Sequence, residues 1–433
     1  MERIEVSTVT KQFKRTFCES RLNELGKAVR FCLRERTVTP FRLVMGLINV
    51  MSTPKVETIA DVQRAFNALC ETDVQYKPFH NQLSKPQFPI LMREVCCRVL
   101  DELACDVLQF GPESPFAQFK HITIQDGTSY AVKPSLKGVW PGRFTATNPA
   151  AVELHVSLDL LTEVVNFATL TPDTDAEAQH LPDAQEVTGG LLLADRGYFK
   201  KQYLMDVDCA GGSFIVRGKA NMNPTVRHAY RHDGTEIKAW QDKPLKQLKH
   251  SFKRYDSIDM DVEYRCENKT FYSRLIVSTR PDDAIPRYLV SNLAREQFSL
   301  AQVSDAYRLR WQIELLFKEW KSYSNVHAFG TSKASIVEGF IWASLCAATL
   351  KRYWAHVTQR LRRVDMSTRK VAMCVHHVLY DILRAMLHHP RRLNVAITRA
   401  IDYLSRNAKR AHPKRDERTG RQKLGLVHVY GLA

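Results

Sequence analysis

The sequence predicts an α/β protein, with a mixed sheet, helical regions on both sides of it and a β-rich segment inserted into it. Short β-branched runs that end in turn residues follow one another between residues 121 and 219, in the order strands, then strand, helix, strand. Helical apolar spacing fills most of the chain before residue 115 and after residue 298. With 433 residues, the chain is long enough for roughly two to four domains.

The first region, residues 1–115, reads as helical. Apolar residues recur at helical spacing in three runs, and Lys and Arg are scattered between them: 41–51, 58–70 and 89–108. We interpret this region as a DNA-binding domain. From composition alone, a helical region with a purely structural role is as well supported as a DNA-binding domain.

The predicted core comprises residues 116–219 and 298–330. Its elements are strands over 121–132, 152–161, 164–172, 191–197 and 212–219, with a helix over 197–208. The second and third strands are separated by a short loop, which suggests a hairpin. Between the two parts of the core, residues 220–297 alternate in polarity and are predicted as a β-rich insertion, with strands over 257–266, 270–279 and 287–293.

Helical character returns at Ser299, where Ser299 and Gln302 match a capping box and Phe298 is placed for a hydrophobic staple. The pattern predicts one helix that runs on through residues 307–321. Residues 331–404 read as further helices, over 335–361 and 368–388. The last stretch, residues 405–433, is basic, contains Pro and Gly, and is predicted as a flexible cationic tail.

The net charge points to a polyanionic partner. Lys and Arg number 63 against 46 for Asp and Glu, a formal charge of +17, which favours nucleic acid over a membrane surface. No run of 18 uninterrupted apolar residues or signal sequence is evident, so we expect no membrane association. The 10 cysteines form no C-x-x-C pair, which fits a reducing cytoplasm.

Four polar residues in the helix predicted over 307–321 share one stripe. At about 100° per residue, they fall within an arc of about 60°: Tyr307, Arg310, Glu314 and Lys321. An apolar stripe with i, i+3, i+4, i+7 spacing lies on another side: Ile313, Leu316, Phe317 and Trp320. For an arbitrary helix, a solvated face with ion pairs is the better interpretation. In the helix predicted over 307–321, large apolar residues lie next to the charged stripe, which favours a functional face over a solvated one.

Two aspartates complete a potential metal site. Asp126 ends the apolar-alternating run HITIQ and Asp195 ends the apolar run LLLA, each at the carboxyl end of a predicted buried strand, although Asp-Gly and Asp-x-Gly are also ordinary turn sequences. Together with Glu314 they offer three carboxylates, which would repel one another without a cation. Mg²⁺ suits a few carboxylates combined with phosphate oxygens, and two such ions could bracket a phosphoryl displacement. Tyr307, Arg310 and Lys321 would then hold phosphates.

These residues carry a resemblance to a known family. The spacing Tyr307-x2-Arg310-x3-Glu314-x6-Lys321 resembles the Y-R-E-K signature of DDE transposases of the insertion-sequence-four type. Asp126 and Asp195 look like that family's two catalytic aspartates, and the β-rich insertion before the glutamate helix is also similar. The resemblance covers residues 120–325 well and the N-terminal region more loosely.

The resemblance implies a ribonuclease-H-like core that cleaves transposon ends and transfers strands into target DNA. Asp126, Asp195 and Glu314 would be the catalytic residues and the ligands of two Mg²⁺ ions, for which Mn²⁺ could substitute. It also implies a prokaryotic, nucleoid-associated protein that acts as a homodimer on DNA ends. In some relatives the reaction passes through a hairpin, with an insertion aromatic residue stacked on an extruded base.

Further DNA contacts are expected at Arg217, Lys219 and Trp240, and Tyr230 is a second candidate for base stacking. Two other functions stay open: a catalytically inactive DNA-binding relative, and a metal-dependent nuclease without strand transfer. The presence of all three carboxylates favours the active enzyme over the inactive relative.

Overall fold

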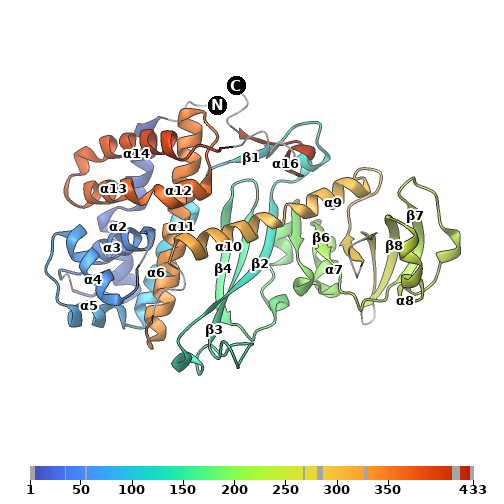
Figure 1. Cartoon of the computed structure of the whole chain (residues 1–433), viewed down its shortest axis with the longest axis horizontal. Coiled ribbons are helices and arrows are strands. Elements are labelled where there is room, and N and C mark those ends of the chain that lie inside the picture. The colour runs from blue at the N-terminus through green and yellow to red at the C-terminus, as the bar shows by residue number, and fades with distance from the viewer. Residues whose placement is uncertain are drawn as a thin grey trace.

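The computed structural model describes the chain except for residues 1–4, 35, 54–55, 267–268, 280–285, 326–329, 412–419 and 430–433. A helical lobe lies at one end, a sheet crosses the middle, and the inserted segment forms the other end (Figure 1). The predicted fold class, an α/β core with a β-rich insertion and helical regions on both sides, is confirmed.

In the described residues, nine strands form one sheet in the order β4-β3-β2-β5-β6-β10-β9-β8-β7. Its bounds are β2 Ile122–Ala131, β3 Ala151–Asp159, β4 Val164–Pro172, β5 Leu191–Ala194, β6 Ser213–Arg217, β7 Thr225–Arg231, β8 Ser257–Cys266, β9 Lys269–Ser278 and β10 Arg287–Ser291. The strands β2, β5 and β6 are parallel, and the other pairs are antiparallel. The predicted hairpin is β3–β4.

The insertion extends the same sheet, because β10 pairs with β6. A second apolar core, separate from the main one, lies around the insertion. It includes residues of the insertion's short helix α8 (Leu245–Leu248) and of helix α7 (Lys201–Cys209). The main core is continuous from the N-terminal helices through β2, β3 and β5 to the C-terminal helices.

The helical lobe combines both ends of the chain. Its N-terminal helices are α1 Val6–Thr16, α2 Glu19–Ala28, α3 Pro40–Ser52, α4 Ile59–Cys70, α5 Tyr76–Leu83 and α6 Gln87–Glu102. Its C-terminal helices are α11 Ala334–Arg362, α12 Thr368–Cys374, α13 His376–His388 and α14 Leu393–Asn407. Helix α11 packs against α3 and α6, so the N-terminal region is no detached module.

Among the described residues, α11 is long and apolar enough to cross a membrane. However, 78% of its most apolar 18-residue window is buried inside the protein, as in a core helix.

The prediction of a flexible tail differs from the structure at its described residues. Helix α14 runs on to Asn407, and α16 (Gly420–Lys423) leads into β11 (Leu426–His428), which pairs with β1 (Leu108–Phe110). Leu424 and Leu426 are buried in the main core. Residues 412–419 and 430–433 of the predicted tail lie outside the described residues.

The helix predicted through residues 307–321 is two helices, α9 (Leu300–Arg308) and α10 (Trp311–Tyr323). The predicted capping box at Ser299 and Gln302 begins α9. Between the helices, Leu309, Arg310, Gln312 and Ile313 donate backbone hydrogen bonds to residues three positions earlier. These bonds tighten the chain locally, so the turn before α10 departs from ideal α-helical geometry.

Candidate active site

Asp126 lies in the middle of β2, at the point where its parallel neighbour ends. The last pair between β2 and β5 is Gln125 with Ala194, and β2 then continues beside β3 alone. Asp126 and Asp195 therefore follow adjacent paired residues on adjacent parallel strands. The alternative of a turn at Asp126-Gly127 is wrong, because both residues pair with β3.

Asp195 follows β5 and is bound from two sides. The Tyr307 hydroxyl donates a hydrogen bond of 3.2 Å to its Oδ1. Nη1 of Arg217, at the end of β6, lies 3.7 Å from the same oxygen. Burial, and then the nearby Asp195 carboxylate, raise the pKa of Tyr307, so the phenol stays protonated and able to donate.

Arg310 joins the other two carboxylates. Its Nη1 lies 2.7 Å from Oδ2 of Asp126, and its Nη2 binds Oε1 of Glu314. The turn between α9 and α10 thus aims Tyr307 at one catalytic-type aspartate and Arg310 at the other. In the structure, Arg310 neutralises carboxylates, whereas the sequence analysis assigned it to phosphates.

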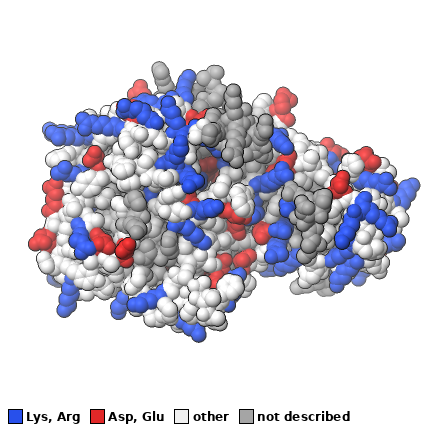
Figure 2. All heavy atoms as spheres, viewed as in Figure 1, with Lys and Arg blue, Asp and Glu red and all other residues white. Residues whose placement is uncertain are grey.

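The pKa of Asp126 reflects the other two carboxylates of the predicted site. Burial raises the pKa of Asp126 to about 6; Arg310 opposes this, and the charges of Asp195 and Glu314 add to it. Acids from β2, β5 and α10 thus affect one another. On the face in Figure 2, acidic side chains gather near the middle, with Lys and Arg on both sides.

The family's divalent metal ion can be tested against these residues. Three oxygen donors facing one space, one of them with a raised pKa, suit a hard cation. Within the part of the chain that the structure describes, no three carboxylate, histidine or cysteine side chains already stand close enough to hold an ion. The donor set fits, provided that Arg310 gives up its place between Asp126 and Glu314.

Lys321 lies beside the same strand. Its Nζ stands 5.1 Å from the centre of the Tyr130 ring, and Tyr130 belongs to β2. Burial lowers the pKa of Lys321. No hydrogen bond or ion pair holds Lys321 among the described residues, so its charge is available to a ligand.

The remaining predicted contacts separate into two groups. Lys219 and Asp195 line the same open hollow, next to Arg217. The Trp240 side chain is 7% exposed and packs against Phe252 and Tyr255, so the predicted contact with DNA would require it to leave this packing and stays a prediction. The ring of Tyr230 is covered by Arg295, whose Cζ is 4.3 Å from its centre.

A buried acid beside Asp126 escaped the sequence analysis. Glu153 of β3 is 3% exposed, and burial, followed by the charge of Glu177, raises its pKa to about 7. A Cβ on Gly127 would lie 2.7 Å from Oε1 of Glu153, so glycine makes room for this carboxylate. Arg143 contacts it at 3.4 Å from the loop between β2 and β3. The sequence signal that could have indicated a side chain packed against β2 at this point was the glycine directly after Asp126.

A sheet that brings acids from two parallel strands and a helix to one space, with cations around them, defines a class of phosphoryl-transfer enzymes that act on nucleic acid. The family model described as "Transposase DDE domain" matches residues 117–350, more than half of the chain. The chain therefore belongs to the DDE transposase family.

Relatives match along nearly the whole chain. The transposase of insertion sequence element IS231C from Bacillus thuringiensis is 22% identical over 98% of this chain and 96% of its own length. The transposase of element IS1151 from Clostridium perfringens is 20% identical over 79% of both chains. A solved piggyBac transposase synaptic complex with hairpin DNA is similar at 11% identity and a TM-score of 0.47, over 94% of this chain and 89% of that one.

Proposed function

We propose that this DNA transposase cleaves transposon ends and joins them to target DNA, with Asp126, Asp195 and Glu314 as the catalytic residues and the ligands of two Mg²⁺ ions. One observation carries the proposal: Arg310 bridges Asp126 and Glu314, and the hydroxyl of Tyr307 binds Asp195. The three acids are thus held near one another by the two residues that stand beside them in the predicted signature.

The chain's own residues would bind and orient the substrate. When bound, the metal ions would activate a water or 3′-hydroxyl nucleophile and stabilise the leaving oxygen. A phosphate of the DNA would draw Arg310 away from Asp126 and Glu314, which frees both carboxylates. Arg310, Lys321 and the Tyr307 hydroxyl would then bind nonbridging oxygens and fix the phosphate in line for attack.

Lys321→Ala is expected to slow cleavage by roughly 10- to 100-fold, because one charge-assisted contact to phosphate is lost. The melting temperature should change little, since no hydrogen bond or ion pair to another described residue holds the side chain, which lies near the Tyr130 ring. Gel assays of end cleavage and calorimetry measure the two effects. Lys137→Ala, at an exposed lysine in the loop between β2 and β3, is the matched control. A large loss of stability would assign Lys321 to the fold instead.

We propose that the helices of residues 1–115 contribute to recognition of the transposon end. Deleting them would expose the core they share with α11, so surface charges are the better test. Replacing exposed Lys11, Lys14 and Arg34 by Ala should reduce the preference for the cognate end about 10-fold, with general DNA binding retained. Competition binding with unrelated DNA measures it. Unchanged preference would move recognition to another region.

DNA is the partner of the family, and we propose assembly of two copies on paired ends in the bacterial cytoplasm, in association with the nucleoid. The charge of +17 supports such an association. Strand joining in addition to cleavage separates this function from that of a metal-dependent nuclease. Cleavage of either kind separates it from an inactive DNA-binding relative.

A further inference from the structure

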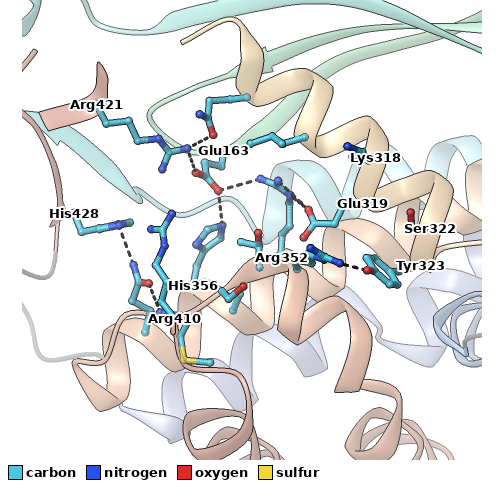
Figure 3. A pocket seen from close by; sticks show the side chains of 18 residues that line it. Glu163, Lys318, Glu319, Ser322, Tyr323, Arg352, His356, Arg410, Arg421 and His428 are labelled. Carbon is cyan, nitrogen blue, oxygen red and sulfur yellow. Dashed lines mark hydrogen bonds and ion pairs between the residues drawn. The ribbon is translucent and has the colours of Figure 1, made fainter. Parts of the chain in front are cut away.

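A cavity of about 470 Å³ lies beside α10, away from the face that carries Glu314. Its α10 wall has residues at helical spacing, Gln312, Leu315, Glu319 and Ser322. Helices α11 and α12 and the C-terminal segment of α16 and β11 provide the other walls, as Figure 3 shows. The volume is within the usual range for a small-ligand site, about 300–1,000 Å³.

A buried charge network builds one wall. Glu163 binds Nη1 of Arg352 at 3.0 Å, Nη2 of Arg421 at 3.2 Å and Nε2 of His356 at 3.4 Å. Arg352 also binds Glu319 at 2.9 Å (Figure 3). These contacts fix α11, α10 and the C-terminal segment to one another, so the cavity has a rigid base.

The polar groups of the cavity differ between its interior and its opening. Glu319 lines the cavity; its Oε1 atom is buried, and no donor among the described residues hydrogen-bonds to that atom. The exposed side chains of Lys318 and Arg369 also line the cavity. Nε of Arg369 donates a hydrogen bond of 3.2 Å to the Tyr323 hydroxyl. An acceptor without a donor therefore lies inside, where Arg352 and Arg421 are already paired with Glu163, and the cations Lys318 and Arg369 lie toward solvent.

The apolar lining gives the cavity a third property. Leu315, Ala355, Met366 and the ring of Tyr323 offer flat or apolar surface between the acceptor and the cations. A ligand that matches has an anionic group, a flat body and an N–H donor. A nucleotide has all three, because its phosphate is joined through a sugar to a base with N–H groups.

We infer that this cavity takes one nucleotide of a single-stranded stretch of DNA, with its phosphate on Lys318 and Arg369 and its base toward Glu319. The inference rests on the proposed function, since it requires DNA at α10. A base within a duplex is stacked and paired, so only an unpaired nucleotide can enter a concave site. Lys318 and exposed Trp311 lie on the α10 surface between Glu314 and the cavity, which gives the strand a route from the active site.

Photocrosslinking tests this directly. A single-stranded oligonucleotide with one 4-thiothymidine is irradiated with the full-length protein, and adducts are mapped by mass spectrometry. We expect an adduct within residues 311–323 or 366–369. The double variant Lys318→Ala, Arg369→Ala should reduce that adduct about 10-fold, because two charge-assisted contacts are lost. Both residues are exposed, so the variant should fold, and Lys137→Ala, at an exposed lysine in the loop between β2 and β3, should have no effect.

Competitors identify the occupant. Unlabelled single strand should suppress the adduct, whereas duplex of equal length and free ATP should compete at least 10-fold less well. Equal competition by duplex would make the cavity a backbone contact, and stronger competition by ATP would make it a free-nucleotide site; either result overturns the inference. So would adducts confined to other regions.

The inactive variant Asp126→Asn separates this inference from the proposed function. It should keep the adduct, because the cavity lies on another face of α10. If the wild-type protein forms the adduct but shows no strand transfer, the cavity assignment stands and the proposed function is refuted. Normal transfer without the adduct would refute the cavity assignment alone.

Discussion

Asp126→Asn, Asp195→Asn and Glu314→Gln are each expected to reduce DNA nicking and joining by roughly 10⁴-fold or more. Asp126 lies on β2, Asp195 directly follows β5 and Glu314 lies on α10, and the charges of the last two act on Asp126, so loss of any one would remove a ligand of the proposed site. Combining the substitutions should add little, because residues that act as a unit give non-additive penalties. Single-turnover assays on an end-containing DNA measure these rates.

DNA binding by these variants is the control. It should persist, since the cations remain and local negative charge falls. Burial raises the pKa of Asp126 to about 6, so above that pH the carboxylate is charged in the folded protein and destabilises it relative to the unfolded chain. Asp126→Asn should therefore not lower the melting temperature at neutral pH without metal ions. Loss of both DNA binding and stability would show that the acids maintain the fold instead.

Glu163→Gln is expected to lower the free energy of unfolding by about 3–5 kcal/mol, the usual cost of breaking a buried ion pair from one side. The substitution removes the carboxylate that Arg421, a largely buried side chain, pairs with, and it leaves buried Arg352 with Glu319 alone. Glu24→Gln, at an exposed position on α2, is the matched control and should change stability little. Urea denaturation followed by circular dichroism measures both.

The pH dependence of this effect has a defined sign. Burial alone would raise the pKa of Glu163, but His356, Arg352 and Arg421 together hold it well below its usual range. The stabilisation is therefore complete above the ordinary glutamate pKa and is lost as the pH falls through the lowered value. The difference between the wild-type protein and Glu163→Gln should close in strong acid. A constant difference across the acid range would contradict this role of the carboxylate.

The sequence predicted the elements around the candidate site well, because they have strong local signals. The start of β2 alternates apolar and polar residues up to Asp126, and the buried parallel strand β5 reads as the apolar run LLLA, which Asp195 ends visibly. The capping box of α9 was also local, since Ser299 and Gln302 are three residues apart. The site assignment itself remains a prediction until the variants above are tested.

What the sequence could not predict depends on distant partners. Glu163 and Arg421 are 258 residues apart, and nothing local distinguishes Arg421 from the other cations of a basic stretch. Their ion pair explains why residues 420–428 are packed where a flexible tail was predicted. Likewise, Trp240 was interpreted from its region alone, whereas aromatic neighbours within the insertion decide its burial.

The break between α9 and α10 shows a second limit. Helical periodicity places Tyr307, Arg310 and Glu314 on one stripe whether or not the helix is continuous. Only the tightened turn at residues 309–313 reveals that Tyr307 reaches Asp195 while Arg310 reaches Asp126 and Glu314. The stripe thus predicted which side chains lie on one face of the helix, but not which carboxylate each of them binds.

Cleavage and joining of the DNA that flanks the gene, with and without Mg²⁺, tests the central claim most directly. We expect the purified wild-type protein to nick and join these ends with Mg²⁺ or Mn²⁺ and to stop when a chelator is added. The double variant Asp195→Asn, Glu314→Gln should bind the same DNA without cutting it. A double variant that cuts at the wild-type rate would contradict the assignment of these carboxylates as the metal-dependent catalytic site.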